Sequence, residues 1–463
     1  MVLRIGFAQW AVIAVAFCLA SCSGAQGGGG TTLVPARSTP PTHKKHSSDL
    51  IQHIIVVIQE NRSFDDLFAT YPGAEGATQG LMETSAGDVY VPLKVTKLSQ
   101  ICDPGHGYKG FLKSYDGGKM DGFGLENGKC GGNHTFPYQY VDPKQIAPYW
   151  TLAQQYVLAD QMFQTQASGS FTAHQDLIAG GTMLNPAKTR SLVDYPSSTP
   201  WGCDAPPGVK TDLLEYVKST LHYKHGQGPF PCLTYTTLRD LLDANSVSWT
   251  YYSPPVKGNS GGVWNAFEAI KAVRYGSEWG TNVTDSNTQI FSDIQYGKLA
   301  AVSWIIPDKE NSDHPASGGD TGPSWVASIV NAVGESPYWN STAIVVVWDD
   351  WGGFYDNAKP PFFDHWGGLG FRVPMLVVSP YTRTGTSTHS YISHTQYEFG
   401  SILRFIEDTF ELGSLGTTDA RATSISDCFN FKQSPRKFTQ IPSSYSRSFF
   451  EHQRPSYLPV DSE

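Results

Sequence analysis

Four continuous apolar runs, rich in β-branched residues, stand out along the chain. Such runs lack the polar alternation of a half-exposed strand and are typical of strands buried on both faces of a parallel sheet. Segments with helical periodicity lie between them. Alternating strands and helices predict an α/β sandwich with a mainly parallel central sheet. The predicted strands are Gln52–Ile58, Ala301–Ile306, Thr342–Trp348 and Val373–Val378, and the predicted helices are Ile146–Asp160, Pro323–Val333 and His394–Phe410.

The stretch from Thr182 to Gly297 has a different pattern. It is rich in Pro, Gly, Ser and Tyr, and its periodicity is weaker than that of the flanking segments. We interpret part of it as a loop-rich elaboration that packs over the edge of the sheet, rather than as an independent domain. The sequence shows no internal repeat.

The first residues have the pattern of an export signal. A short basic end, Met1–Arg4, precedes the apolar run Ile5–Ala20, which is too short for a comfortable membrane span. The run ends in Leu19-Ala20-Ser21-Cys22, which resembles a bacterial lipobox, in which the cysteine becomes lipidated. The alternative is an ordinary signal peptide with a chance cysteine. We therefore expect an exported protein, either a membrane-anchored lipoprotein or a secreted one.

Composition divides the rest of the chain. Behind a signal peptide at residues 1–21, residues 22–48 are rich in Gly, Ser, Thr and Pro and predict a flexible linker. Residues 49–440 are the predicted folded domain, and residues 441–463 are a predicted C-terminal tail. No segment after the signal has the about eighteen apolar residues that a transmembrane helix needs.

Overall composition limits the classes of function. The chain has 463 residues, of which 40% are hydrophobic and 16% are charged, and this excludes a disordered chain or a coiled coil. The formal net charge of -9 argues against a general nucleic-acid-binding surface, so we expect no nucleic acid partner. The sequence does not indicate an oligomeric state.

The seven cysteines fit an exported protein, because disulfides form outside the cytosol. Cys18 lies in the signal and Cys22 at the lipidation position, which leaves five. The economical pairs are Cys102–Cys130 and Cys203–Cys232, each of which closes a loop worth on the order of 3 kcal/mol. Cys428 would then be a buried free thiol, although other pairings are open.

Acidic residues follow two of the predicted strands. Glu60 and Asn61 come after the first strand, and Asp349 and Asp350 come after the third. In parallel α/β sheets, polar residues just beyond the carboxyl ends of strands tend to line the active site. Carboxylate and amide oxygens suit hard cations such as Ca, Mg or Mn. These residues predict a divalent metal site, although Asn61 and Asp350 are also suited to capping helices and turns.

Ordered blocks of sequence extend this picture over almost the whole folded part. The blocks are His53–Asp65, Asp103–His106 with Lys119–Phe123, Ala167–Gly180, Val302–Pro307 with Ser312–Pro315, Trp348–Asp356, Phe371–Pro380 and Ser401–Glu407. In this order they resemble a bacterial phosphoesterase family that includes phospholipases C and acid phosphatases. Several blocks in one order are far more specific than any single motif.

The resemblance implies the fold and the metal site. The fold would be an alkaline-phosphatase-like three-layer sandwich, with residues 49–440 as the phosphoesterase catalytic domain. Glu60, Asn61, Asp349 and Asp350 would bind a divalent ion, which could be Ca, Mg, Mn or Zn. Relatives often have Asp-Glu where this chain has two Asp residues, and the shorter side chain would affect metal preference more than reaction class.

The resemblance also implies the nucleophile. Ser170 would attack phosphorus and would also contact the metal. The segment Ser170–His174 aligns with the family pattern Ser-Phe-Pro-Asn-His, from which Thr172 and Ala173 depart. Some relatives use Thr as the nucleophile, so Thr172 is the alternative to Ser170.

Histidines supply the remaining implied roles. His106 and His314 match active-site histidines of the acid phosphatase relatives, and would bind phosphoryl oxygens or protonate the leaving alcohol. His174 would orient Ser170 or the metal ligands. His222 and His225 are candidates for a further pair. The alternative for each is a structural or solvated histidine.

Two further residues in the blocks have alternative roles. Arg62 could contact phosphate or form a salt bridge, and Asp356 is expected to bind a neighbouring loop rather than metal. The implied function is hydrolysis of a phosphoric ester, either a phosphomonoester or a phospholipid head group, by a protein tethered to the membrane through its lipid. The alternative is a catalytically inactive surface lipoprotein that binds a phosphorylated ligand.

Overall fold

The computed structural model describes residues 47–126, 130–195, 198–256, 262–361, 368–385, 390–454, 456 and 458–460. The predicted signal peptide, the lipobox at Cys22 and almost all of the predicted linker lie outside these residues. Within them, we find no helix whose length and apolar character would let it cross a membrane.

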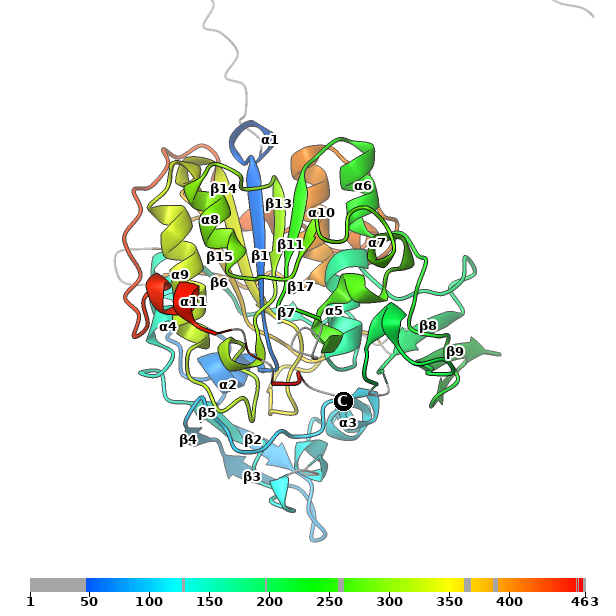
Figure 1. The fold of residues 1–463 in the computed structure, drawn as a ribbon. Coiled ribbons are helices and arrows are strands. Elements are labelled where there is room, and N and C mark those ends of the chain that lie inside the picture. The colour runs from blue at the N-terminus through cyan, green and yellow to red at the C-terminus, as the bar shows by residue number, and fades with distance from the viewer. Residues whose placement is uncertain are drawn as a thin grey trace, which may run out of the picture. The chain divides into compact units, whose positions relative to one another are not determined.

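An eight-stranded sheet forms the centre of the domain (Figure 1). Its strand order is β12-β11-β13-β1-β14-β15-β6-β16, and every strand except β15 runs in the same direction. The prediction of a mainly parallel sheet is therefore confirmed. The strands are β1 (His53–Gln59), β6 (Val157–Ala159), β11 (Trp249–Tyr252), β12 (Val283–Thr284), β13 (Val302–Ile305), β14 (Thr342–Trp348), β15 (Met375–Val378) and β16 (Tyr391–Ser393).

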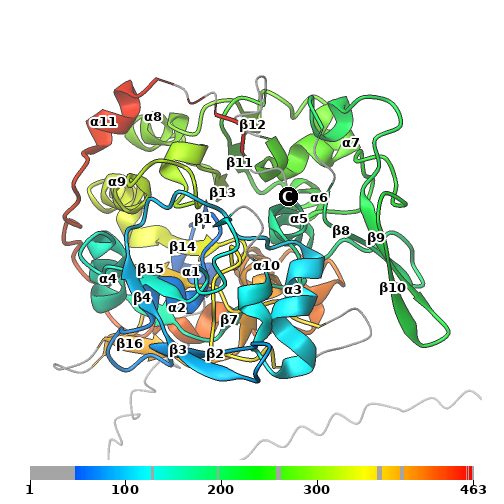
Figure 2. The same ribbon diagram turned by 90° about the horizontal axis from the view of Figure 1, so that it is seen from below.

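Helices cover both faces of this sheet and give the three layers that the fold prediction requires (Figures 1 and 2). One face carries α4 (Ala147–Gln155), α8 (Gln289–Gln295) and α9 (Gly322–Gly334), and the other carries α5 (Ser170–Ala179), α6 (Leu238–Ala244) and α10 (Phe399–Phe410). All seven residues of β14 are buried, as expected for a strand between two helical layers.

Shorter elements complete the domain around this core. The helices are α1 (Ser47–Leu50), α2 (Phe64–Phe68), α3 (Tyr108–Tyr115), α7 (Lys271–Arg274) and α11 (Arg447–His452). The strands are β2 (Gln79–Met82), β3 (Val89–Pro92), β4 (Lys94–Thr96), β5 (Gln139–Val141), β7 (Met162–Phe163), β8 (Arg190–Val193), β9 (Asp212–Val217), β10 (Thr220–Lys224) and β17 (Tyr397–Glu398).

Two predicted helices extend too far at one end. The helix predicted over Ile146–Asp160 ends at Gln155, because the next apolar residues form β6 and pair with β15 inside the sheet. The helix predicted over His394–Phe410 begins only at Phe399. There Glu398 closes a reciprocal capping box with Ser401, whose hydroxyl accepts the Glu398 N–H at 3.0 Å.

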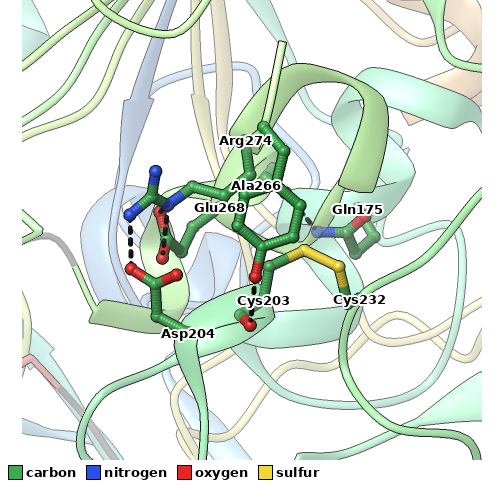
Figure 3. The surroundings of a disulfide bond; sticks show 8 residues. Gln175, Cys203, Asp204, Cys232, Ala266, Glu268 and Arg274 are labelled. Atoms are coloured by element: carbon green, nitrogen blue, oxygen red, sulfur yellow. Dashed lines mark hydrogen bonds and ion pairs between the residues drawn. A yellow bond between two sulfur atoms is a disulfide. The ribbon is translucent and has the colours of Figure 1, made fainter.

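The segment predicted as an elaboration has two parts. Strands β8, β9 and β10 form a separate antiparallel sheet at the side of the domain, whereas β11 and β12 extend the central sheet. The disulfide Cys203–Cys232 lies close to α5, where the Gln175 side chain donates to the Ala266 carbonyl at 2.9 Å (Figure 3). The segment therefore packs directly against the helix that carries Ser170.

The predicted cysteine pairing is confirmed. Cys102–Cys130 and Cys203–Cys232 are disulfides, and Cys428 is free and buried. Part of the predicted C-terminal tail contacts the core, since Phe450 of α11 is buried and its ring centroid lies 5.3 Å from that of Trp325 in α9.

Candidate active site

The ends of two neighbouring strands bring the predicted acidic residues together. Strands β1 and β14 pair in parallel with Gln59 opposite Trp348, so the residues that follow them leave the sheet side by side. The Asn61 N–H donates to Asp349 Oδ1 at 3.0 Å. Gly352 makes this approach possible, because a Cβ there would lie 2.1 Å from the Asn61 carbonyl oxygen.

Asn61 holds a central position in this cluster. Its backbone is left-handed, with φ of 58°, a conformation that Asn adopts more readily than most residues. Its side-chain amide donates to His106 Nε2 at 2.8 Å and lies 3.4 Å from Asp350 Oδ2. Its amide oxygen lies 3.4 Å from the Ser170 hydroxyl oxygen. One side chain therefore contacts a histidine, a carboxylate and the predicted nucleophile.

Ser170 is the first residue of α5 and is fully buried. Its hydroxyl donates to Asp350 Oδ2 at 3.1 Å. The positive end of the helix macrodipole lies here, and it favours negative charge on or next to the side chain. Thr172 points elsewhere, since its hydroxyl donates to Ser168 at 3.0 Å.

His174 lies one turn further along α5 and faces the other side of the cluster. Its Nε2 is 2.9 Å from Glu60 Oε1 and 3.7 Å from Asp349 Oδ2. Burial lowers the pKa of His174 to about 4, and the charge of Asp349 opposes that effect only partly. At neutral pH the ring is therefore uncharged and can donate Nε2–H to Glu60.

His106 and His314 approach the cluster from loops. His106 donates Nδ1–H to the Pro104 carbonyl at 2.8 Å, which turns its Nε2 towards Asn61. The rings of His106 and His314 lie 6.3 Å apart, and His314 packs against Trp264 at 5.7 Å. Asp103, 3.6 Å from His106 Nδ1, joins them, so the second and fourth sequence blocks meet here.

The further histidine pair suggested by the sequence is not part of this site. His222 lies in β10, and His225 follows it, with its side chain 72% exposed and bonded to Asp212 at 2.8 Å. The β9–β10 hairpin reaches outward from the domain (Figure 2). The sequence offered these two histidines only as candidates, and nothing in it revealed that β10 belongs to a separate sheet rather than to the central one.

The buried carboxylates fit a divalent cation. Burial, and next the charge of Asp349, raise the pKa of Asp350 well above its usual range. Among the described residues, Asp349 Oδ2 has no hydrogen-bond partner, and the side chains that form ion-pair contacts with Asp349 and Asp350 are His174 and His106. Oxygen ligands around a buried excess of negative charge are the environment that a hard cation requires.

Donor atoms gather in two groups within this region. The ligand atoms of Glu60, His174 and Asp349 lie within 4.8 Å of one another, and so do those of Asp103, His106 and His314. Sequence reasoning singled out every member of these groups except Asp103. The Asp103–His106 block contained it, but no pattern in the sequence set it apart from a turn residue.

Comparison with known proteins now identifies the family. The Phosphoesterase family matches the chain over residues 51–413, which is most of its length. The chain belongs to the Phosphoesterase family. This membership places it among the hydrolases that act on phosphoric ester bonds.

Three relatives illustrate the similarity within the phosphoesterases. Non-hemolytic phospholipase C of Burkholderia pseudomallei is 24% identical over 89% of this chain and 63% of its own length. Phospholipase C B of Mycobacterium tuberculosis is 24% identical over 89% of this chain and 82% of its own. Non-specific phospholipase C1 of Arabidopsis thaliana is 24% identical over 84% of this chain and 72% of its own length. The chain thus spans less than two thirds of the Burkholderia relative.

A solved structure from Vibrio parahaemolyticus, described as a protein in the alkaline phosphatase superfamily, covers 82% of this chain and 72% of its own. Its TM-score is 0.36 and its sequence identity 10%. A lipoteichoic acid synthase of Listeria monocytogenes has a TM-score of 0.35, and the match covers 80% of this chain and 76% of the synthase chain. Similarity at this level does not contribute to the assignment of function.

Two charged residues of the phosphoesterase blocks, Arg62 and Asp356, form buried ion pairs next to the site. Arg62 is fully buried and bonds to Asp66 at 2.9 Å and to the carbonyls of Leu98 and Asp313. Its donors are therefore used within the protein, which favours the salt-bridge interpretation over phosphate binding.

Asp356 pairs with the buried Arg372 at 3.0 Å, as the structural interpretation expected. Arg372 also lies 3.3 Å from Asp65 and bonds to the carbonyls of Glu75 and Asp160. Breaking such a buried pair leaves an uncompensated charge, which costs about 3–5 kcal/mol. This network fixes the loop that leaves β14 next to the segment that follows β1.

Proposed function

We propose that the protein is a metal-dependent phosphoric ester hydrolase that acts through a phosphoserine intermediate. The position of the Ser170 hydroxyl carries this proposal: it lies 3.1 Å from Asp350 and 3.4 Å from Asn61, at the first residue of a helix. A nucleophile placed directly against buried oxygen ligands is the arrangement that this chemistry needs. Acid phosphatase and phospholipase C are the two subclasses that fit.

The metal site would consist of Glu60, Asn61, Asp349 and Asp350, with Ser170 as a further ligand. A divalent ion held there would lower the pKa of the serine hydroxyl and offset charge on the phosphoryl group. The chain itself supplies position: Asp350 accepts the Ser170 hydrogen bond, and the start of α5 presents backbone N–H groups to a phosphoryl oxygen.

Histidines would handle the protons. Ser170 Oγ gives its proton to Asp350, which accepts its hydrogen bond, and forms a bond to phosphorus while the bond between phosphorus and the leaving oxygen breaks. The leaving alcohol takes a proton from His106 or His314, whose Nδ1 atoms are held by the carbonyls of Pro104 and Pro315. Water then cleaves the phosphoserine and restores the hydroxyl. His174 acts as a positioning residue for Glu60, since it is uncharged at neutral pH.

A substrate panel with and without chelator tests the function. We expect hydrolysis of a phosphomonoester, a phosphocholine diester or both, and a fall of at least about 100-fold after chelation that an added divalent ion reverses. Cleavage of the diester alone would reject the phosphatase subclass. Full activity in protein shown by elemental analysis to be metal-free would refute the metal mechanism.

We further propose that the protein is exported and tethered to a membrane through Cys22. The basic end, the short apolar run and the small residues before Cys22 support this location. We expect the wild-type protein to sediment with membranes and the Cys22→Ala protein to lose that association. Equal membrane recovery of the two proteins would contradict the lipid anchor.

A further inference from the structure

Three acidic residues come together away from the active site. Glu83 directly follows β2, Asp116 begins the short 3-10 helix Asp116–Gly118, and Asp121 precedes the 3-10 helix Gly122–Leu125. Carboxylate oxygens from the three lie within 4.8 Å of one another. The backbone fixes two of them together, because the Glu83 N–H donates to the Asp121 carbonyl at 2.8 Å.

Asp121 sets this group apart from an ordinary acidic surface. It is only 1% exposed, and neither of its carboxylate oxygens has a hydrogen-bond partner among the described residues. Burial, and next the charge of Asp116, raise the pKa of its carboxyl group. A buried carboxylate whose oxygens no other residue hydrogen-bonds is costly, so its retention requires an explanation.

The neighbouring charges compensate this group only in part. Lys119 pairs with Asp116, but its side chain is 63% exposed. Asp88, in the turn between β2 and β3, adds a further negative charge that acts on both Asp121 and Lys119. Among the described residues, the three clustered carboxylates and Asp88 surround the exposed Lys119 ammonium, and the Lys359 ammonium lies near the neighbouring Gly118. The exposed Lys119 side chain can move into solvent when another cation arrives.

We propose that Glu83, Asp116 and Asp121 form a second metal site that binds Ca²⁺. All of the donors are oxygens, which excludes the ligand sets typical of zinc or copper. Oxygens on opposite sides of a calcium ion lie about 4.6–5.2 Å apart, since each Ca–O distance is about 2.3–2.6 Å. Three oxygens that lie within 4.8 Å of one another can therefore contact one such ion, and the exposed side of the group leaves room for water ligands.

The ion would fasten two segments that support the active site. Glu83 belongs to the β2–β3 hairpin, and Asp116 and Asp121 lie between α3 and the 3-10 helix that contains Phe123. The ring centroid of Phe123 lies 5.7 Å from that of Trp351, the residue that directly follows Asp350 in the sequence. Calcium at this position would therefore stabilise the domain near the active site without taking part in the reaction.

Calcium binding is best measured with the active site disabled. In the full-length Glu60→Gln/Asp350→Asn protein, we expect equilibrium dialysis to find one Ca²⁺ per chain, and Ca²⁺ to raise the Tm by about 2 °C or more. Adding Asp121→Asn should abolish both effects. Adding Glu83→Gln, at an exposed position, should weaken Ca²⁺ binding at least 10-fold. This variant tests the proposed site if the Asp121→Asn protein does not fold.

Asp88→Asn is the matched control, because it removes the same charge from the same neighbourhood but no proposed ligand. We expect it to weaken Ca²⁺ binding less than about 3-fold. The proposal is overturned if the protein with the disabled active site shows no saturable binding below about 10 mM Ca²⁺. It is also overturned if Glu83→Gln and Asp88→Asn weaken binding equally, since that result would indicate diffuse charge attraction.

Discussion

The Ser170→Ala protein is expected to lose on the order of 10⁴–10⁶ of kcat, the range seen when a nucleophile is removed. The hydroxyl is fully buried and contacts Asp350 and Asn61, so its removal deletes the attacking atom. The fold should survive, because the substitution costs roughly the 1 kcal/mol of a lost hydrogen bond. Steady-state kinetics and a thermal melt on the same preparation measure the two effects.

Thr172→Val is the matched control, because it removes the competing hydroxyl of the same helix. The Thr172 hydroxyl donates to Ser168 rather than to the acidic cluster, so we expect kcat to change less than about 10-fold. Rapid quenching with labelled substrate should trap a covalent phosphoryl group on the wild-type and Thr172→Val proteins but not on Ser170→Ala. A label that persists in Ser170→Ala and disappears in Thr172→Val would move the nucleophile to Thr172.

The strands at the centre of the sheet could be predicted because strands buried on both faces consist of consecutive apolar residues. His53–Gln59 and Thr342–Trp348 are covered by helices on both faces, and only continuous apolar runs tolerate that environment. Strands β11 and β12, at one end of the sheet, are short, with four and two residues, and lie in a loop-rich segment. Their assignment depends on pairing with β13 and with each other, which no local pattern reports.

The residues of the site also fall into those that the sequence could predict and those that only the fold reveals. Residues that directly follow a buried strand, such as Glu60 and Asp349, were predictable, because strand ends in a parallel sheet meet at one edge. Trp264 joins His314 only through a tertiary contact between distant loops. Asp103 is three residues from His106 in the sequence, but the two gather with His314 only where their loops meet in the fold. For the same reason, the acidic group at Glu83, Asp116 and Asp121 could not be recognised: its members come from a hairpin and two separate turns.

Asp350→Asn is expected to separate metal binding from folding. Asp350 is fully buried beside Asp349, so the loss of its charge removes one ligand and also one source of repulsion. We expect metal affinity to fall by about 10²-fold or more and kcat/KM to fall with it at limiting metal. The metal-free protein should be as stable as wild type or more stable. The wild-type gain of about 2.7 kcal/mol at 100 times its Kd should fall to about 0.4 kcal/mol or less in the variant at the same metal concentration.

Asp356→Asn is the same chemical change six positions away, and it should lower stability while leaving metal affinity almost unchanged. Asp356 pairs with the buried Arg372, so its replacement should lower the free energy of unfolding by about 3 kcal/mol with metal affinity within about 3-fold of wild type. Calorimetric titration and denaturant unfolding of both variants measure the two quantities. If Asp350→Asn instead destabilised the metal-free protein and kept wild-type metal affinity, its carboxylate would be a structural group like Asp356, and the metal site would have to exclude it.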